Sequence, residues 1–473
     1  MTFHRSSAAI AALSVLFAAG SLADQPPASP SEGKLPTLRL ADVSLDVLVS
    51  GGGSSASAHE LETLQGGGHD PKRNGFTLQA AELSLSGAID PYFTGEAHIL
   101  FSEEGVELEE AYLKSGALGD GLELKAGYFL TEFGRVNPTH PHAWSFIDQP
   151  VVATRLLGGE GLRNAGFRIS GLLPTPWYSE LLVGAQNADG EFAASFRGGA
   201  VAHDHGEEGH DHAAEEEHAE EEDHEHEHAD EDHEGEHEEE HAHVELPEGV
   251  EGGVGGRPIV ELETDGADDL LYLARWVNSG DLSGDTSVQL GLSSLFGPNH
   301  TGEGGSTVLT GADLTIAWTP ADNFRGWPFL KIETEVMHRD FKADEAVLDH
   351  GDGDVDTLPG ATLTDWGFYT QAVYGFAYRW SAGLRFEQAT GSGDSLEGRD
   401  SDPYRNDRTR ISPLLVFQPT EFSRVRVQYN YDDTETLEDG DAHTLPPILK
   451  GLFATPPSPT FSRRHSPPPP DQP

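Results

Sequence analysis

A two-residue alternation of apolar and polar side chains constrains the fold more than any other feature of this chain, and it recurs between residues 35 and 443. Leu122, Leu124 and Ala126, for example, alternate with Glu123 and Lys125. Successive side chains of a β-strand point to opposite faces, so each such segment has one apolar and one polar face. The segments are about 9 to 14 residues long, which exceeds the usual globular strand of about 5 to 6 residues and fits a tilted membrane strand.

The polar faces of these segments carry Arg, Glu, Lys and Gln, which the interior of a soluble β-sandwich could not bury. A β-barrel in lipid instead turns apolar side chains outward and polar side chains into a wet lumen. The alternation predicts about 15 strands, at 35–50, 75–89, 91–102, 105–117, 121–133, 163–173, 178–188, 269–279, 285–296, 306–319, 327–340, 365–378, 380–391, 407–418 and 421–432. Because such barrels have an even number of strands, the sequence predicts an all-β transmembrane antiparallel barrel of about 16 strands.

The connections between the predicted strands alternate in length. Short turns such as 89–91 and 320–323 lie opposite long loops such as 51–74, 134–162 and 190–268. Short periplasmic turns and long external loops are typical of bacterial outer-membrane barrels. The sequence therefore predicts a location in the bacterial outer membrane, with loop 190–268 facing outside the cell.

The two ends of the chain differ from the barrel in composition. Residues 1–23 have a short basic start, an apolar run and a small-residue cleavage site, which predicts a secretory signal peptide. We expect a Pro-rich linker at 24–34, the barrel at 35–443 and a tail at 444–473, in which Pro recurs too often for a strand. The tail is therefore expected to be disordered or the product of a shifted reading frame, with the sixteenth strand missing.

The longest predicted loop contains a tract, residues 203–243, with 12 His, 21 Asp or Glu and no Lys or Arg. We expect the tract to be disordered, because no apolar residue larger than Ala is present to offset its ordering entropy. Imidazole and carboxylate groups together bind Zn²⁺, and also Ni²⁺ or Cu²⁺. The predicted metal ligands are His203, His205, His210, His212, His218, His224, His226, His228, His233, His237, His241 and His243. The alternative is a passive acidic brush that hydrates the surface.

A second His-x-His pair, His140 and His142, lies in predicted loop 134–162. Pro141 between them restricts the loop, so the pair is a candidate metal site if it faces the lumen. The alternative is that the loop packs on the barrel wall and each imidazole binds a backbone carbonyl.

The charge of the chain favours cations as partners. The net charge is −52. The tract contributes −21 of it, so the remainder carries −52 + 21 = −31. Such acidity argues against nucleic acid as a partner. Arg385, Arg424 and Arg426 lie on predicted lumen faces, and we expect them to pair with acidic residues across the lumen rather than to bind anions.

Residues 106–174 resemble phosphate-selective-porin-like outer-membrane proteins, in particular the branch with His-rich loops that is associated with zinc uptake. The shared motifs are L-K-A-G-Y-F at 124–129, E-F-G-R at 132–135, G-x-E-G-L-R at 158–163 and G-F-R-I-S at 166–170. The resemblance implies a porin of 16 strands whose third external loop folds into the lumen. The chain departs from the family in its acidic body, which disfavours phosphate selectivity, and in the missing terminal strand.

These features together predict an outer-membrane porin-like channel for divalent metal ions, zinc foremost, with the tract as an external collector. The alternatives are a general or anion (phosphate)-selective porin, a surface metal buffer anchored by a barrel, and a TonB-linked zinc receptor without a recognisable plug. The chain contains no P-loop, nucleophile elbow or zinc-protease motif, so we expect no enzyme and no cofactor other than Zn²⁺ as the bound or transported ion. Expected partners are outer-membrane lipid, the barrel-assembly machinery and two further copies in a homotrimer.

The tract can be tested as an isolated peptide of residues 203–243. Near pH 7 its imidazoles are mostly neutral and free to bind Zn²⁺, whereas at pH 5, below their ordinary pKa of about 6.5, protons displace the metal. Isothermal titration should show several weak Zn²⁺ sites at pH 7 and strong loss of binding at pH 5. Binding of less than one ion, or binding unchanged at pH 5, would contradict the collector hypothesis.

Overall fold

The computed structural model describes residues 42–453 apart from 104, 117, 119–120, 199–251, 261, 263, 350–354, 394–401, 438–439 and 446. The predictions of a signal peptide at 1–23, a linker at 24–34 and a disordered tract at 203–243 therefore lie outside the described residues.

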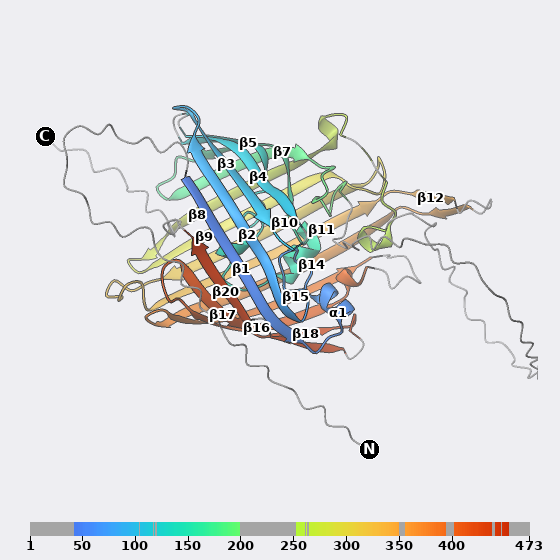
Figure 1. The fold of residues 1–473 in the computed structure, drawn as a ribbon. Helices are drawn as coiled ribbons and strands as arrows, with labels where there is room; N and C mark the ends of the chain where they lie inside the picture. Colours follow the sequence, from blue (N-terminus) through green and yellow to red (C-terminus); the bar gives the residue numbers. More distant parts are fainter. Residues whose placement is uncertain are drawn as a thin grey trace, which may run out of the picture.

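The chain forms a single tilted barrel of long strands (Figure 1). Its strands are β1 (Asp42–Ser54), β2 (Gly75–Ala88), β3 (Phe93–Phe101), β4 (Val106–Ser115), β5 (Leu122–Leu130), β6 (Arg163–Leu172), β7 (Tyr178–Asn187), β8 (Leu270–Ser283), β9 (Thr286–Pro298), β10 (Ser306–Trp318), β11 (Phe329–Ala343), β14 (Ala361–Ala377), β15 (Trp380–Ser392), β16 (Arg408–Phe417), β17 (Ser423–Gln428), β18 (Asn430–Thr434), β19 (Asp441–Leu445) and β20 (Pro447–Phe453). All of the predicted strands are present, with ends that differ by a few residues.

Each barrel strand pairs antiparallel with its neighbour in the sequence. β17 and β18 form one strand that is interrupted at Tyr429, and both pair with β16. β19 and β20 form the next strand, which pairs with β18 and β17 on one side and with β1 on the other. Within the described residues the barrel is thus closed and has 16 strands, as predicted.

The prediction that the tail contains no strand is wrong for its first part. β20 pairs with β1 from Ile448 to Phe453, opposite Ser50 to Leu45, and closes the barrel. The Pro content of the tail was misleading, because a proline at the start of a strand is tolerated. The six residues that follow Pro447 are not proline, so each has a backbone N–H that can donate to a neighbouring strand. The barrel therefore extends to residue 453 rather than 443.

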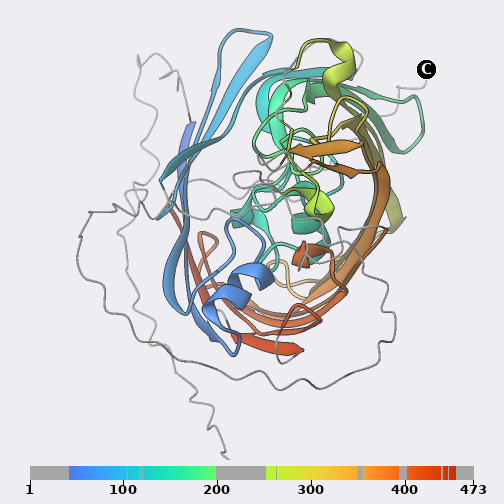
Figure 2. The same cartoon turned by 90° about the vertical axis from the view of Figure 1, so that its right-hand side faces the viewer.

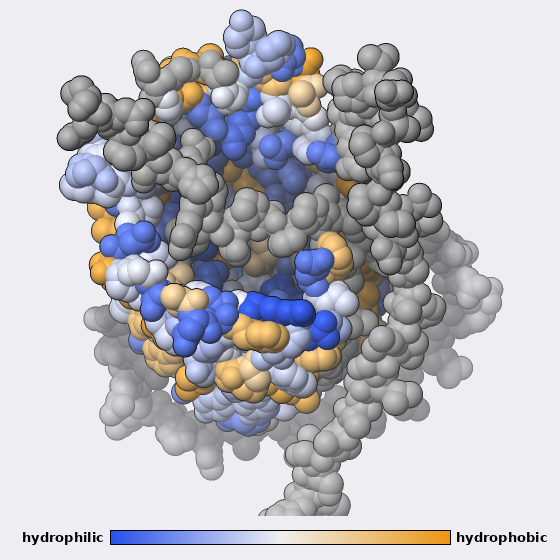
Figure 3. Space-filling view, turned by 90° about the vertical axis from the view of Figure 1, so that its left-hand side faces the viewer, coloured by the Kyte–Doolittle hydropathy of each residue, from blue (hydrophilic) through white to orange (hydrophobic). Residues whose placement is uncertain are grey.

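The two faces of the barrel wall have opposite polarity. In β16, Ile411 and Leu415 are 38% and 42% exposed on the outside, whereas Arg410 and Ser412 are 1% and 0% exposed on the inside. Figure 3 views the end of the barrel with the short turns and shows hydrophilic residues inside its hollow and hydrophobic residues on its outer surface. A closed barrel with this polarity is that of an outer-membrane protein.

The long loops fold back over and into the lumen, as Figure 2 shows from the long-loop end. They contain α1 (Ala58–Leu64), η1 (Pro141–Ala143), α2 (Val151–Leu157), η2 (Val254–Gly256), η3 (Ala267–Asp269), η4 (Pro403–Arg405) and a separate hairpin of β12 (Ala346–Asp349) and β13 (Val355–Leu358). No described helix is both long enough and apolar enough to cross a membrane.

Loop L3, residues 131–162, enters the lumen and contains η1 and α2. Val152, Ala153 and Leu156 of α2 pack in one buried apolar cluster with Leu309 of β10 and Met337 of β11. Apolar burial of this kind contributes about 25 cal/mol per Å². L3 is thus packed against one side of the barrel wall, as the family resemblance implied for the third external loop.

Barrel closure through β20 can be tested with proline substitutions. Leu449 pairs with Val49 on one side and with Val425 on the other, so Leu449→Pro removes a backbone donor from an internal strand. We expect most of the variant to lose the compact, heat-modifiable band in unheated SDS electrophoresis. Ser458→Pro, beyond the last residue of β20, serves as the control and should fold like the wild type. Equal folded fractions of the two variants would contradict closure by β20.

Candidate metal site in the lumen

Loop L3 turns into the lumen at the E-F-G-R motif. Gly134 has a φ of +62°, and a Cβ there would lie 1.6 Å from Oε1 of Glu335. Glycine is therefore required, because it alone combines this backbone conformation with so close an approach. The next backbone N–H, of Arg135, donates to Glu335 Oε1 at 2.9 Å, and the Arg135 side chain donates to Glu333 Oε1 at 2.6 Å. These contacts fix where L3 begins to cross the barrel.

Asp148 anchors the middle of L3 to the opposite wall. Its carboxylate accepts hydrogen bonds from Arg385, from Arg410 at 3.0 Å, from Gln428 at 2.7 Å and from Asn430 at 2.6 Å. Asp148 and both arginines are about 1% exposed. Burial opposes the charged form of the carboxyl, but the two guanidinium groups hold the pKa of Asp148 below its usual value. L3 is therefore tied to the wall by charge-assisted hydrogen bonds.

Two further arginines hold the backbone of L3. Arg424 donates to the carbonyls of His142 and Trp144 at 3.0 and 3.1 Å, and Arg426 donates to those of Trp144 and Phe146 at 3.0 and 2.6 Å. The prediction of acidic partners across the lumen is confirmed for Arg385, which binds Asp148. The hydrogen bonds shown for Arg424 and Arg426 go instead to loop carbonyls, which a single sequence could not reveal. These arginines position the segment that carries His140 and His142.

The wall that faces this segment is made by β2, β3 and β4. The register of β3 and β4 shifts between His98 and Ile99, so that Glu109 has no partner of its own. This β-bulge turns two consecutive side chains, Glu109 and Glu110, into the lumen, where they are 2% and 4% exposed. Glu82 of β2, 2% exposed, lies beside them. The bulge thus concentrates carboxylates at one level of the wall.

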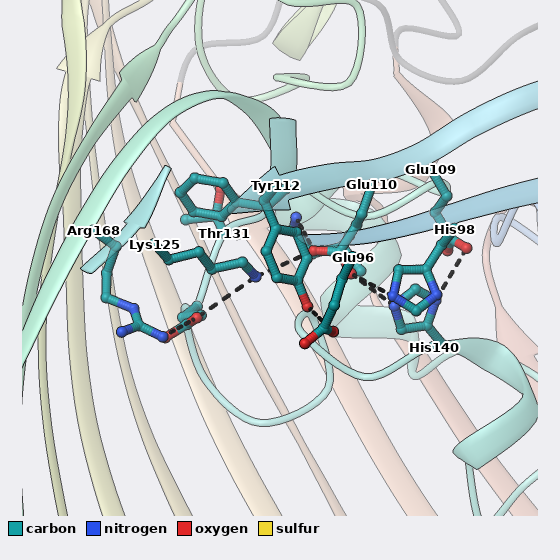
Figure 4. A network of polar contacts seen from close by, with 12 residues as sticks. Glu96, His98, Glu109, Glu110, Tyr112, Lys125, Thr131, His140 and Arg168 are labelled. Atoms are coloured by element: carbon teal, nitrogen blue, oxygen red, sulfur yellow. Dashed lines mark hydrogen bonds and ion pairs between the residues drawn. The ribbon is translucent and has the colours of Figure 1, made fainter. Parts of the chain in front are cut away.

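His140 lies among these carboxylates. Its Nδ1 is 3.0 Å from Glu109 Oε2 and 3.5 Å from Glu82 Oε1, and its Nε2 is 2.8 Å from Glu110 Oε2. Its ring centroid is 4.4 Å from that of His98 on β3 (Figure 4). Both ring nitrogens of His140 therefore face carboxylate oxygens, and the predicted alternative of bonds to backbone carbonyls is wrong for this residue.

His142 and His98 complete the group on either side of His140. His142 Nδ1 is 2.6 Å from Glu82 Oε2, and His98 Nδ1 is 3.0 Å from Glu82 Oε1. His98 Nε2 is 4.0 Å from Glu110 Oε2. These residues form the lumen cluster, which consists of Glu82, His98, Glu109, Glu110, His140 and His142. The side chain of His142 is 25% exposed, which gives the cluster access to lumen water.

Two sets of three residues in the lumen cluster have the geometry of a metal site. They are Glu82, His140 and His142, and His98, Glu110 and His140. In each set the ligand atoms lie within 4.8 Å of one another, and each set combines two imidazoles with one carboxylate. Two His and one carboxylate are a ligand set that suits Zn²⁺ and leaves a coordination position open. The residues present therefore fit a divalent metal ion.

The electrostatics of the cluster favour a bound cation. Lys125 Nζ, 3.3 Å from Glu110 Oε1, offsets only part of the charge of the three carboxylates. Burial disfavours the charged form of His140, but Glu109, Glu110 and Glu82 outweigh burial and hold the pKa of His140 well above its usual value. The pocket therefore favours a positive charge, which either a proton on His140 or a metal ion can supply.

A cavity of about 880 Å³ lies at the long-loop end of the barrel. Its charged lining consists of His69, the basic residues Lys72 and Arg73, and an excess of carboxylates, namely Glu62, Asp70, Glu103, Glu107, Glu160 and Glu191. His69 Nε2 is 3.1 Å from Glu160 Oε2. Burial lowers the pKa of His69, but Glu160 more than compensates and raises it to about 8. The mouth of the barrel thus presents acidic groups to an approaching ion.

The structure brings together one predicted pair of site residues and adds four that the sequence did not single out. His140 and His142 lie in the lumen, whereas the twelve predicted ligands of the tract lie outside the described residues. His98 could have been noticed, because it shares the inward face of predicted strand 91–102 with Glu96. The roles of Glu82, Glu109 and Glu110 depend on pairing between strands and on the bulge, which no local pattern signals.

Comparison with known proteins shows what the chain resembles. No family model matches it. A protein of Aquifex aeolicus described as uncharacterized is 29% identical over 421 residues, covering 85% of this chain and 75% of that protein. The resemblance to the phosphate-selective porins and their zinc-associated branch stays a prediction.

Solved structures of porins and channels are similar at much lower identity. The outer-membrane channel DcaP of Acinetobacter baumannii has a TM-score of 0.48 and 13% identity, covering 87% of this chain and 97% of its own. The anion-selective porin of Comamonas acidovorans has a TM-score of 0.46 and 9% identity, covering 87% and 100%. OmpT, an outer-membrane protein of Vibrio cholerae, has a TM-score of 0.44 and 8% identity, covering 89% and 100%. At these identities no substrate can be carried over to this chain.

The anchoring role of Asp148 can be tested by Asp148→Asn, which keeps the shape of the side chain and removes its charge. Breaking a buried pair typically costs about 3–5 kcal/mol, because the partner charge is left uncompensated. We expect L3 to detach from the arginines, which should give larger and noisier single-channel conductance in planar bilayers. Asp281→Asn, at an exposed position of β8, is the control. Identical conductance in Asp148→Asn and wild type would show that Asp148 does not hold L3.

Proposed function

We propose that this protein is an outer-membrane channel for divalent metal ions, zinc foremost, with the lumen cluster as the site that ions occupy on their way through. The observation that carries the proposal is the position of His140 and His142. L3 brings them from the middle of a long loop to the carboxylates of two strands, β2 and β4, that lie on either side of β3. An ordinary polar lumen would not require two imidazoles in contact with three buried carboxylates.

The ligand types favour zinc over other common ions. Ca²⁺ and Mg²⁺ prefer sites made of oxygen alone, whereas the cluster offers three imidazoles. Cu⁺ prefers sulfur ligands, and the chain has no Cys and two Met. Each set of ligands has three members, His140 is shared by both sets, and His142 of the first set is 25% exposed to water. Such a site would bind an ion without enclosing it, as transport requires.

The distribution of acidic groups supports a route from the long-loop end to the cluster. The carboxylates of the mouth cavity would attract cations and raise their local concentration. In this proposal the long loops face outside the cell, and the tract 203–243 collects metal above the mouth. His69, which lines the mouth cavity, pairs with Glu160 of L3.

The alternative of a general or anion-selective porin has less support from the lumen. The arginines that could form an anion path, Arg385, Arg424 and Arg426, are occupied by Asp148 and by carbonyls of L3. The net charge of −31 outside the tract also favours cations. Anion preference in bilayer recordings would place this alternative first.

Zinc entry into proteoliposomes loaded with a fluorescent zinc indicator tests the proposal. The variants are His140→Gln and His142→Gln, and His443→Gln, at the exposed long-loop end of β19, is the matched control. We expect wild type and His443→Gln to admit zinc equally. Each lumen variant should admit zinc about tenfold more slowly at low micromolar zinc, since loss of a ligand weakens capture.

Potassium conductance measured on the same preparations separates loss of metal capture from loss of folding. Variants that conduct potassium like the wild type but admit zinc poorly support the proposal. Unchanged zinc entry in both lumen variants would contradict it.

A further inference from the structure

The two metal sets of the lumen cluster use opposite sides of one imidazole ring. His140 Nδ1 faces Glu82, at 3.5 Å, and the ring stacks on His142, which also binds Glu82. His140 Nε2 faces Glu110, at 2.8 Å, and the Nε2 of His98 approaches the same carboxylate oxygen. The cluster therefore has two candidate ion positions, one on each side of the His140 ring.

A neutral imidazole can serve only one of these positions at a time. One of its nitrogens carries a proton, and the other offers the lone pair that a metal needs. If His140 binds an ion through Nδ1, its Nε2 bears the proton, and the reverse holds for an ion at Nε2. The remaining members of either set, one imidazole and one carboxylate, are too few to hold an ion tightly.

We infer that the lumen cluster is a pair of mutually exclusive zinc stations that share His140, so that one ion at a time occupies the cluster and passes from one side of the ring to the other. The inference rests on the proposed function and specifies how its site works. The first station is formed by Glu82, His142 and His140 Nδ1. The second is formed by His98, Glu110 and His140 Nε2.

Carboxylates at both ring nitrogens suit this exchange. With the ion at the first station, the Nε2–H donates to Glu110 Oε2 at 2.8 Å. With the ion at the second station, the Nδ1–H donates to Glu109 Oε2 at 3.0 Å. A carboxylate that accepts from the non-ligating nitrogen orients the imidazole and strengthens its bond to the metal. When the ion passes from Nδ1 to Nε2 of His140, Nε2 loses its proton and Nδ1 gains one. Lumen water can accept the first proton and supply the second.

A shared ligand also explains how a buried site could release its ion. Each station loses His140 as soon as the ring serves the other station, so neither forms a closed four-ligand cage of the kind that holds structural zinc. The second station lies directly beside the first, because His98 and His142 both contact Glu82. An ion can thus leave one set of ligands while the next set is within reach.

The experiment counts zinc ions bound to the full chain in detergent. All twelve tract histidines are replaced by Asn in the parent protein, so that calorimetric titration reports on the remaining sites. His142→Gln removes a ligand from the first station only, and His98→Gln removes one from the second only. The double variant His98→Gln/His142→Gln disables both stations, and His443→Gln is the control for an exposed histidine.

We expect the parent and His443→Gln to bind one zinc ion in the lumen cluster. Each single variant should still bind one ion, with a Kd raised no more than about tenfold because the intact station takes over. The double variant should lose this binding event. Potassium conductance of each variant in bilayers verifies that the barrel has folded.

Two results would overturn the inference without affecting the proposed function. Two ions bound together in the parent would show that the stations are independent. Loss of binding in either single variant would show one joint site rather than two. Absence of any lumen binding in the parent would instead count against the proposed function itself, and the inference would fall with it.

Discussion

The structure depends on the requirement that every backbone N–H and C=O in a membrane has a partner. No water is available in the hydrocarbon core, so a sheet there must close on itself. The chain meets this requirement through β19 and β20, which join β1 to β17 and β18. Closure makes one face of the sheet the lumen wall, and the alternation of side chains along each strand then decides which charges face the lumen. The positions of Glu82 and His98 thus follow from the same constraint that makes the barrel stable.

The closed wall encloses many buried charges, and these are accommodated differently on the two sides of L3. On one side of L3 they are partnered within the protein. Arg385 pairs with Asp148 and Glu387, and Arg410 pairs with Asp148 and Asp432. Arg424 and Arg426 donate hydrogen bonds to loop carbonyls. On the other side the carboxylates of the lumen cluster exceed the nearby cations and are partnered mainly by imidazoles. Imidazoles are the one kind of partner that can accept either a proton or a metal ion at neutral pH. The imbalance favours positive charge on this side of the lumen, and the proposed metal site rests on it.

Much of the fold could be predicted from the sequence because β-strands have a strict period of two residues. That period gave the positions of nearly all strands and the inward direction of residues such as Arg385. It failed at β20, where two adjacent prolines concealed a strand that begins at the second of them, Pro447. It also failed at the bulge, since Glu109 and Glu110 are neighbours in the sequence and a regular strand would send one of them outward. The lumen cluster joins residues from 82 to 142, and contacts over that separation depend on register that a single sequence does not display.

The central claim is that the lumen cluster binds the ion that the channel admits. Anomalous diffraction at the zinc absorption edge, from crystals of the full chain equilibrated with micromolar zinc, tests it most directly. We expect anomalous density beside His140, on the side of Glu82 and His142 or on that of His98 and Glu110, with a summed occupancy of no more than one. Zinc that is bound elsewhere in the barrel while both sides of His140 stay empty would contradict the claim.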